Sequence, residues 1–172
     1  MALAISAVPA LFDDDAIERL SRESPGWKLE LDSLGRLLVS PTFSDGGARD
    51  LEAGAQLHAY AARNGGKAFG SSTGFRLADG SVRAPDAAWI SAERIAGLEP
   101  DARTKYWRIA PDVVVEILSE SDSWPELLAK LDLYERCGCA YVVGIDPFAN
   151  RAEIRGTPPA GLALDIDAIV QA

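Results

Sequence analysis

The pattern of hydrophobic positions between residues 110 and 134 predicts a strand followed by a helix. Residues 113–118 form an apolar run rich in β-branched side chains, which suits a strand buried on both faces. A polar turn follows, and residues 123–126 (Ser-Trp-Pro-Glu) then have the pattern of a capping box with proline in the first helical turn. One ionisable residue, Glu116, interrupts the apolar run. A buried carboxylate costs several kcal/mol unless a cation, a proton or hydrogen bonds compensate for it, so Glu116 needs a structural or functional reason.

The rest of the pattern predicts helices around a series of strands. Helices are expected at residues 13–21 and 48–63, and a short helix with a loop is expected within residues 91–109. Strands are expected at 27–31 and 36–40 as a β-hairpin, at 67–70 and 74–77 as one kinked strand or two, within 81–90, at 140–147, and at 152–155 as an edge. A helix that joins two strands of one sheet implies a parallel pair. The sequence therefore predicts an α/β fold with a mixed β-sheet flanked by helices.

Length and composition predict one globular domain over residues 1–172, with an N-terminal helix and hairpin (1–40) before a core (45–147). The 48% hydrophobic and 25% charged residues are ordinary for a soluble protein, and no apolar run approaches the roughly 20 residues of a membrane span. The apolar N-terminus has no preceding basic residue, so we expect mature protein rather than a signal peptide. Cys137 and Cys139 are too close for an ordinary disulfide, which favours a reducing, cytoplasmic location.

The charge and the single histidine exclude some function classes. With His58 as the only histidine beside two cysteines, a four-ligand zinc site is implausible. A net charge of −9 argues against non-specific nucleic-acid binding by the whole surface. It leaves room for a local basic groove, or for acids gathered around metal ions.

Two Ala-Pro-Asp segments offer a second carboxylate beside Glu116. Asp112 is on the same predicted strand, four residues away, so its Cα lies about 13 Å from that of Glu116. That separation is too long for sharing one Mg²⁺, whose ligands lie about 2.1 Å away. Asp86 is on a different predicted strand, and neighbouring strands are only about 4.8 Å apart. An Asp and a Glu on adjacent strands can hold Mg²⁺ or Mn²⁺ for phosphodiester hydrolysis, so Asp86 is the better partner.

Several spaced motifs carry a resemblance to a known family. They are Pro85-Asp86, the segment 116–121 (Glu-Ile-Leu-Ser-Glu-Ser), the segment 130–134 (Lys-Leu-Asp-Leu-Tyr), Gly138 and Asp146-Pro147. In this order they resemble the Uma-type restriction endonucleases of the PD-(D/E)XK nuclease superfamily. The similarity runs from about residue 39 to the end of the chain and is strongest between Asp86 and Pro147.

The resemblance implies a restriction-endonuclease-like core, dependence on Mg²⁺ or Mn²⁺, and DNA as substrate. It makes Asp86 and Glu116 the metal carboxylates and the backbone carbonyl of Ile117 a further ligand. The superfamily's E-x-K lysine position holds Leu118, and the resemblance gives the lysine's role to Lys130 on the following helix. Related nucleases place another acid or amide on the first long helix, where this chain has Glu52. Cleavage of both strands of a duplex would need two active sites, so we also expect a homodimer.

Each candidate residue also has a purely structural alternative. Glu116 would be a salt-bridged strand residue, and Asp86 a turn or capping aspartate. Lys130 would form a surface pair with Glu126, and Glu52 would be a solvated helix residue. At the level of function, the alternatives to a nuclease are an inactive nuclease-fold module for binding or assembly, and a metal-dependent phosphoesterase for small nucleotides.

Overall fold

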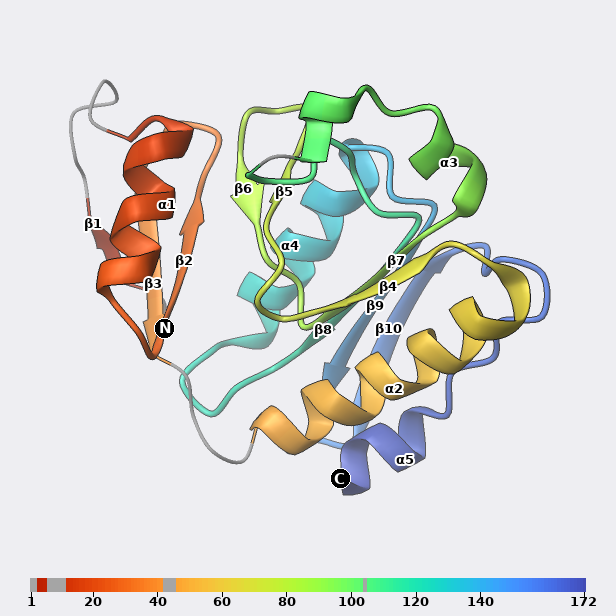
Figure 1. Cartoon of the computed structure of the whole chain (residues 1–172). Helices are drawn as coiled ribbons and strands as arrows, with labels where there is room; N and C mark the ends of the chain where they lie inside the picture. Colours follow the sequence, from red (N-terminus) through yellow and green to blue (C-terminus); the bar gives the residue numbers. More distant parts are fainter. Residues whose placement is uncertain (1–2, 6–11, 42–45, 104) are drawn as a thin grey trace.

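The strands of the computed structural model form two separate five-stranded sheets, and the structure describes residues 3–5, 12–41, 46–103 and 105–172. In the first, which we call the small sheet, all strands are antiparallel to their neighbours. Its order is β1 (Leu3–Ile5), β3 (Leu37–Pro41), β2 (Trp27–Leu31), β6 (Val82–Arg83) and β5 (Phe75–Arg76). In Figure 1 its strands β1, β2 and β3 lie on the left and β5 and β6 lie towards the centre, and the helix α1 (Asp14–Glu23) packs with this sheet.

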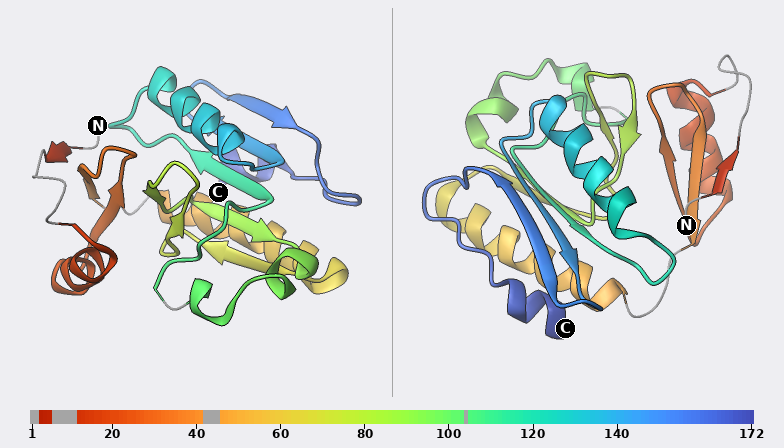
Figure 2. Two further views of the ribbon diagram at one scale, coloured as in Figure 1. Left: turned by 90° about the horizontal axis from the view of Figure 1, so that it is seen from above. Right: turned by 180° about the vertical axis from the view of Figure 1, so that it is seen from behind.

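The second, or main, sheet is mixed and is covered by helices on both faces. Its order is β10 (Arg151–Gly156), β9 (Tyr141–Asp146), β8 (Val113–Ile117), β7 (Ala87–Ile90) and β4 (Lys67–Gly70). Only β8 and β9 are parallel, and α4 (Trp124–Arg136) connects them, as the crossover pattern predicts. The helices α2 (Gly46–Asn64) and α5 (Ile166–Gln171) cover one face and α4 the other (Figures 1 and 2). The predicted α/β fold with a mixed, helix-flanked sheet is thus confirmed.

The alternation of side chains along β8 decides which face Glu116 occupies. Val113 and Val115 belong to the core cluster that includes residues of α2 and α5. Val114 belongs to the cluster that includes residues of α4, because successive side chains of a strand point to opposite faces. Glu116 is even-numbered like Val114 and therefore points to the α4 face.

The start of α4 follows the predicted capping box. The Glu126 carboxylate accepts hydrogen bonds from the Ser123 backbone N–H at 3.1 Å and from the Ser123 hydroxyl at 2.7 Å. Proline lies in the first turn, where its missing N–H costs no intrahelical hydrogen bond. The capping box fixes the first turn of α4, which leaves Lys130 and Tyr134 one and two turns further along the helix.

The structure divides two predicted segments between the sheets. The strand expected within residues 81–90 is two strands, β6 in the small sheet and β7 in the main sheet, separated at Pro85. Proline has no N–H for a ladder and resists the interior of a strand, which explains the break. Residues 67–77 likewise contribute β4 to the main sheet and β5 to the small sheet. The chain therefore passes between the sheets beside Asp86.

The connection from β7 to β8 contains α3 (Ala92–Ala96) and the 3₁₀ helix η2 (Pro100–Arg103), in agreement with the short helix and loop expected there. Among the described residues, no helix has both the length and the apolar composition needed to cross a membrane.

The two leucines of α2 at positions 51 and 57 provide a test of the packing. Leu57 is fully buried in the core beneath α2, whereas the Leu51 side chain is 72% exposed on the same helix. Leu57→Ala should lower the free energy of unfolding by about 2–5 kcal/mol, because it leaves a cavity against the main sheet. Leu51→Ala should change it by less than about 0.5 kcal/mol. Urea unfolding measures both; equal losses would contradict this placement of α2.

Candidate functional site

Asp86, one residue before β7, lies opposite Glu116 on the neighbouring strand β8. Ala87 pairs with Val115 in the antiparallel ladder of β7 and β8, and one further step of this register brings Asp86 opposite Glu116. The Asp86 carboxylate also accepts a hydrogen bond of 2.7 Å from the backbone N–H of Ile117. Glu116 is only 2% exposed. A backbone contact thus fixes the Asp86 carboxylate at the end of β8, on the strand that carries Glu116.

The helix α4 supplies two side chains to the Glu116 carboxylate. The ammonium of Lys130 lies 3.1 Å from Glu116 Oε2, and the hydroxyl of Tyr134 donates a 2.7 Å hydrogen bond to Glu116 Oε1. The two residues are four apart and so share one face of the helix. Lys130 does not pair with Glu126, which caps the helix instead. The structure therefore brings Lys130 and Glu116 together.

The small sheet supplies two further charged side chains, Lys28 and Glu30, which the sequence reasoning missed. They alternate with apolar residues on β2 and so point to the same side of the strand. The Lys28 ammonium lies 2.9 Å from Asp86 Oδ1. Glu30 lies between Leu29 and Leu31, so it is an acid that interrupts apolar positions of a strand, as Glu116 is. This pattern could have identified Glu30 from the sequence.

Glu30 joins the small sheet to the segment that carries Asp86. Its carboxylate accepts a 2.8 Å hydrogen bond from the Ala84 N–H and lies 3.5 Å from the Arg83 guanidinium and 3.8 Å from the Lys130 ammonium. Burial alone would raise the pKa of Glu30, but Lys130, Lys28, Arg83 and the Ala84 N–H lower it to about 2. Glu30 is therefore a charged, structural member of the cluster.

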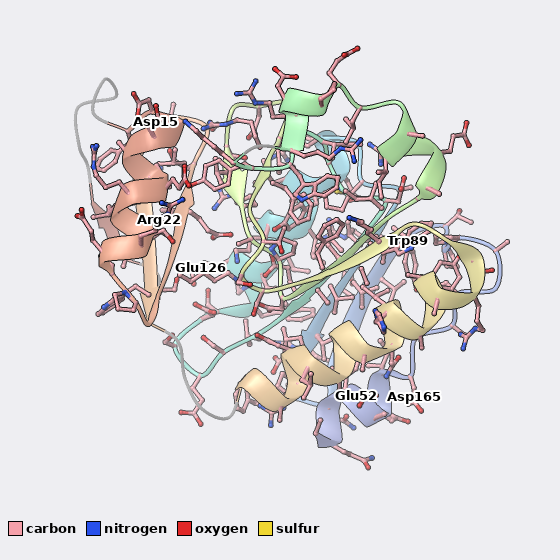
Figure 3. All side chains as sticks on the ribbon, in the orientation of Figure 1. Asp15, Arg22, Glu52, Trp89, Glu126 and Asp165 are labelled. Atoms are coloured by element: carbon pink, nitrogen blue, oxygen red, sulfur yellow. The ribbon has the colours of Figure 1, made fainter. Side chains whose placement is uncertain are left out.

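Of the two acids on α2, Asp50 interacts electrostatically with the site, whereas Glu52 contacts Gln56. Glu52 accepts a 3.0 Å hydrogen bond from Gln56, which also donates to the backbone carbonyl of Asp165 at the start of α5. Figure 3 shows Glu52 beside Asp165 on this side of α2. Asp50 instead interacts electrostatically with Asp86 and Glu116. Residues two apart on a helix are about 200° apart around its axis, so only one of these two acids can face the site.

The pKa shifts show a surplus of negative charge at the site. Burial, then Asp86 and Glu116, raise the pKa of Asp50 from 3.8 to about 7, against the opposing effects of Lys28 and a hydrogen bond with Ser71. Burial, Asp86 and Glu30 also raise the pKa of Glu116, although Lys130 and Lys28 act in the opposite direction. Carboxylates whose ionisation is disfavoured by their neighbours form a place where an added cation would be stabilised.

The donor chemistry of the site fits a hard divalent cation. Asp50, Asp86 and Glu116 offer carboxylate oxygens, the ligands that Mg²⁺ and Mn²⁺ prefer. In the part of the chain that the structure describes, no three His, Cys, Asp or Glu side chains are already grouped to hold a metal ion. The Asp86 and Glu116 oxygens are instead engaged by Lys28 and Lys130. A cation would therefore require these ion pairs to rearrange.

The structure also shows the contacts of Asp112 and Ile117, two further residues considered in the sequence. Asp112, set aside because of its distance along the strand, pairs with the Arg94 guanidinium at 2.7 Å and accepts a 2.8 Å hydrogen bond from the Ser91 N–H. Ile117 contacts the site through its N–H, which donates to Asp86. The role of its carbonyl as a ligand stays a prediction.

Comparisons with known proteins identify the family and support the fold. The model of the Uma2 family, described as "putative restriction endonuclease", matches residues 14–163. The chain belongs to the Uma2 family. The resemblance seen in the sequence is thereby confirmed, and membership supports a nuclease function. A search of curated proteins finds no match.

A solved structure supports the same fold for this Uma2 protein. It is a crystal structure from Anabaena variabilis ATCC 29413, described as a "putative nuclease belonging to DUF820". The match has a TM-score of 0.64 and 20% sequence identity, and it covers 83% of this chain and 89% of the other. At this identity the likeness shows a shared fold.

The raised pKa of Asp50 leads to a pH-dependent prediction. Ionised Asp50 opposes folding increasingly as the pH rises from its unfolded value near 3.8 through about 7. A pKa shift of this size corresponds to a loss of about 4 kcal/mol in the free energy of unfolding when Asp50 is ionised. Because the Asp50 side chain is partly exposed, solvent screening reduces this loss to about 1–2 kcal/mol. Asp50→Asn should therefore raise the free energy of unfolding by that amount at pH 8, and by less at pH 5. Urea unfolding with a chelator present measures this.

The matched control for Asp50→Asn is Glu52→Gln on the same helix. It should change the free energy of unfolding by less than about 0.5 kcal/mol at either pH. If Asp50→Asn is neutral or destabilising at pH 8, Asp50 does not lie among the other carboxylates.

Proposed function

We propose that this Uma2 protein is a divalent-cation-dependent DNA endonuclease that hydrolyses phosphodiester bonds. The observation that carries the proposal is the contact of Asp86 and Glu116 with lysines at the end of two adjacent strands. Paired carboxylates, a cation and a neighbouring ammonium are the groups that phosphodiester hydrolysis requires. Family membership supports the same reaction class.

Asp86 and Glu116 would hold the cation, Mg²⁺ or Mn²⁺, with the Ile117 carbonyl as a further ligand and Asp50 as a third carboxylate. When bound, the cation would polarise the scissile phosphate and lower the pKa of a water molecule. The Ile117 N–H keeps Asp86 in place, and the Tyr134 hydroxyl keeps Glu116 in place, because each donates to one oxygen of its carboxylate. These contacts preorganise the ligands before any ion arrives.

Lys130 would take the role of the lysine that the E-x-K position lacks. Leu118 occupies that position as a buried, apolar residue whose backbone N–H bonds the Ile145 carbonyl of β9. The Lys130 ammonium reaches the same carboxylate from the helix opposite. Burial would lower the pKa of Lys130, but Glu116 and Glu30 raise it, so the amine stays charged at neutral pH. A permanent ammonium stabilises negative charge on a phosphate rather than acting as a base.

Glu116→Gln tests the cation site. It keeps the size of the side chain and removes its charge, so Mg²⁺- or Mn²⁺-dependent cleavage of plasmid and single-stranded DNA should fall by about 100-fold or more. Glu120→Gln, in the exposed turn after β8, is the matched control and should cleave at the wild-type rate. Cleavage that survives Glu116→Gln, or that needs no divalent cation, would contradict the proposal. A wild-type protein that binds DNA without cutting it would favour an inactive nuclease-fold module.

We further propose that the active form on duplex DNA is a homodimer, since each strand requires its own active site. Light scattering at the concentration used for cleavage should give twice the mass of the 18.3 kDa chain. Double-strand cleavage by a species of monomeric mass would argue against this form.

A further inference from the structure

Lys28 occupies the centre of the acidic cluster. Its ammonium contacts Asp86, and it also interacts electrostatically with Glu30, Asp50 and Glu116. Burial would lower the pKa of Lys28, but Asp86, Glu116 and Glu30 raise it above its ordinary value. An ammonium that interacts with all four carboxylates lies where the field of the cluster favours positive charge.

Both oxygens of Asp86 are already engaged within the chain. Oδ2 accepts the Ile117 N–H at 2.7 Å, and Oδ1 pairs with the Lys28 ammonium at 2.9 Å. The N–H is part of the backbone at the end of β8 and is fixed by the fold. The ammonium is the contact that can move. A divalent cation that binds Asp86 through Oδ1 would therefore compete with the Lys28 ammonium for that oxygen.

The position of Lys28 on β2 allows its side chain to move while the backbone stays in place. β2 pairs along its full length with β3, from Trp27 opposite Pro41 to Leu31 opposite Leu37. The Lys28 side chain has a flexible four-carbon stem and is 20% exposed. Rotation of this stem would free Asp86 and leave the ammonium next to the site.

We propose that Lys28 is a second lysine of the reaction site, supplied by the small sheet, which neutralises Asp86 when no cation is bound and contacts the substrate phosphate once a divalent cation has displaced it. The proposal rests on the proposed function, because it concerns the same carboxylates. Lys130 faces Glu116 and Lys28 faces Asp86, so the two ammoniums flank the carboxylate pair. A phosphate held beside that pair would have a positive charge on each side, although the whole protein carries a net charge of −9.

Lys28→Met separates this role from a merely structural one. It removes the competing charge and keeps the apolar stem, so Mn²⁺ should bind about tenfold more tightly in a calorimetric titration. With Ca²⁺ in place of Mn²⁺, the same variant should bind a short DNA duplex about tenfold more weakly, as fluorescence anisotropy would measure. If Lys28 were purely structural, Lys28→Met would weaken the binding of both Mn²⁺ and the DNA duplex.

Two further variants keep the test decisive. Lys67→Met removes a lysine from β4 in the main sheet and should leave the Mn²⁺ affinity unchanged. Lys28→Arg keeps the positive charge, so its Mn²⁺ affinity should stay within about threefold of the wild-type affinity. This variant tests the competition between the side chain and Mn²⁺ for Asp86 even if Lys28→Met fails to fold.

Mn²⁺ binding to Lys28→Met no tighter than to the wild type, or unchanged duplex binding, overturns the proposal. Neither readout needs cleavage. Failure of the proposed function, seen as wild-type protein that does not cut DNA, is therefore distinct from failure of the role of Lys28.

Discussion

Balance of buried charge at the junction of the two sheets is the constraint on which the rest of the structure depends. Four carboxylates meet three cationic side chains there: Glu30, Asp50, Asp86 and Glu116 with Lys28, Arg83 and Lys130. Removing one of the three cationic side chains from such a cluster would leave a buried carboxylate uncompensated and cost about 3–5 kcal/mol. The raised pKa of Asp50 shows that the acids are not fully neutralised. The small sheet, the main sheet and two helices all contribute, so their positions are coupled through these charges.

This balance explains why the chain retains costly buried acids. A fold that needed only stability would gain from apolar residues in their place. A site that exchanges an internal ammonium for a divalent cation needs carboxylates held ready and a counter-charge that can leave. Backbone and hydroxyl donors hold Asp86 and Glu116, while lysines on flexible stems provide the counter-charge. The change of the E-x-K lysine to Leu118 fits this arrangement, since the helix and the small sheet supply ammoniums to the two carboxylates.

The sequence was sufficient where the signal is local. The apolar run of β8 and the capping box of α4 both correspond to the structure. It was insufficient where the contact depends on how separate elements meet. Lys28 on β2 of the small sheet pairs with Asp86, which lies 58 positions later in the chain, just before β7 of the main sheet. The sequence pattern predicts one strand within residues 81–90, so it does not show that the chain crosses from one sheet to the other at Pro85. The same limit applies on α2, where the sequence pointed to Glu52 and did not single out Asp50, because helical phase separates two acids that are almost adjacent in the sequence.

The most direct test of the account is a crystal structure of the protein soaked in Mn²⁺, recorded with anomalous scattering. The account predicts one anomalous peak between Asp86 and Glu116, within about 2.4 Å of a carboxylate oxygen of each. It also predicts that the Lys28 ammonium has left Asp86 Oδ1, where it now lies at 2.9 Å. No peak at these carboxylates, with Lys28 still paired to Asp86 at saturating Mn²⁺, would contradict the central claim that the cluster is a cation site.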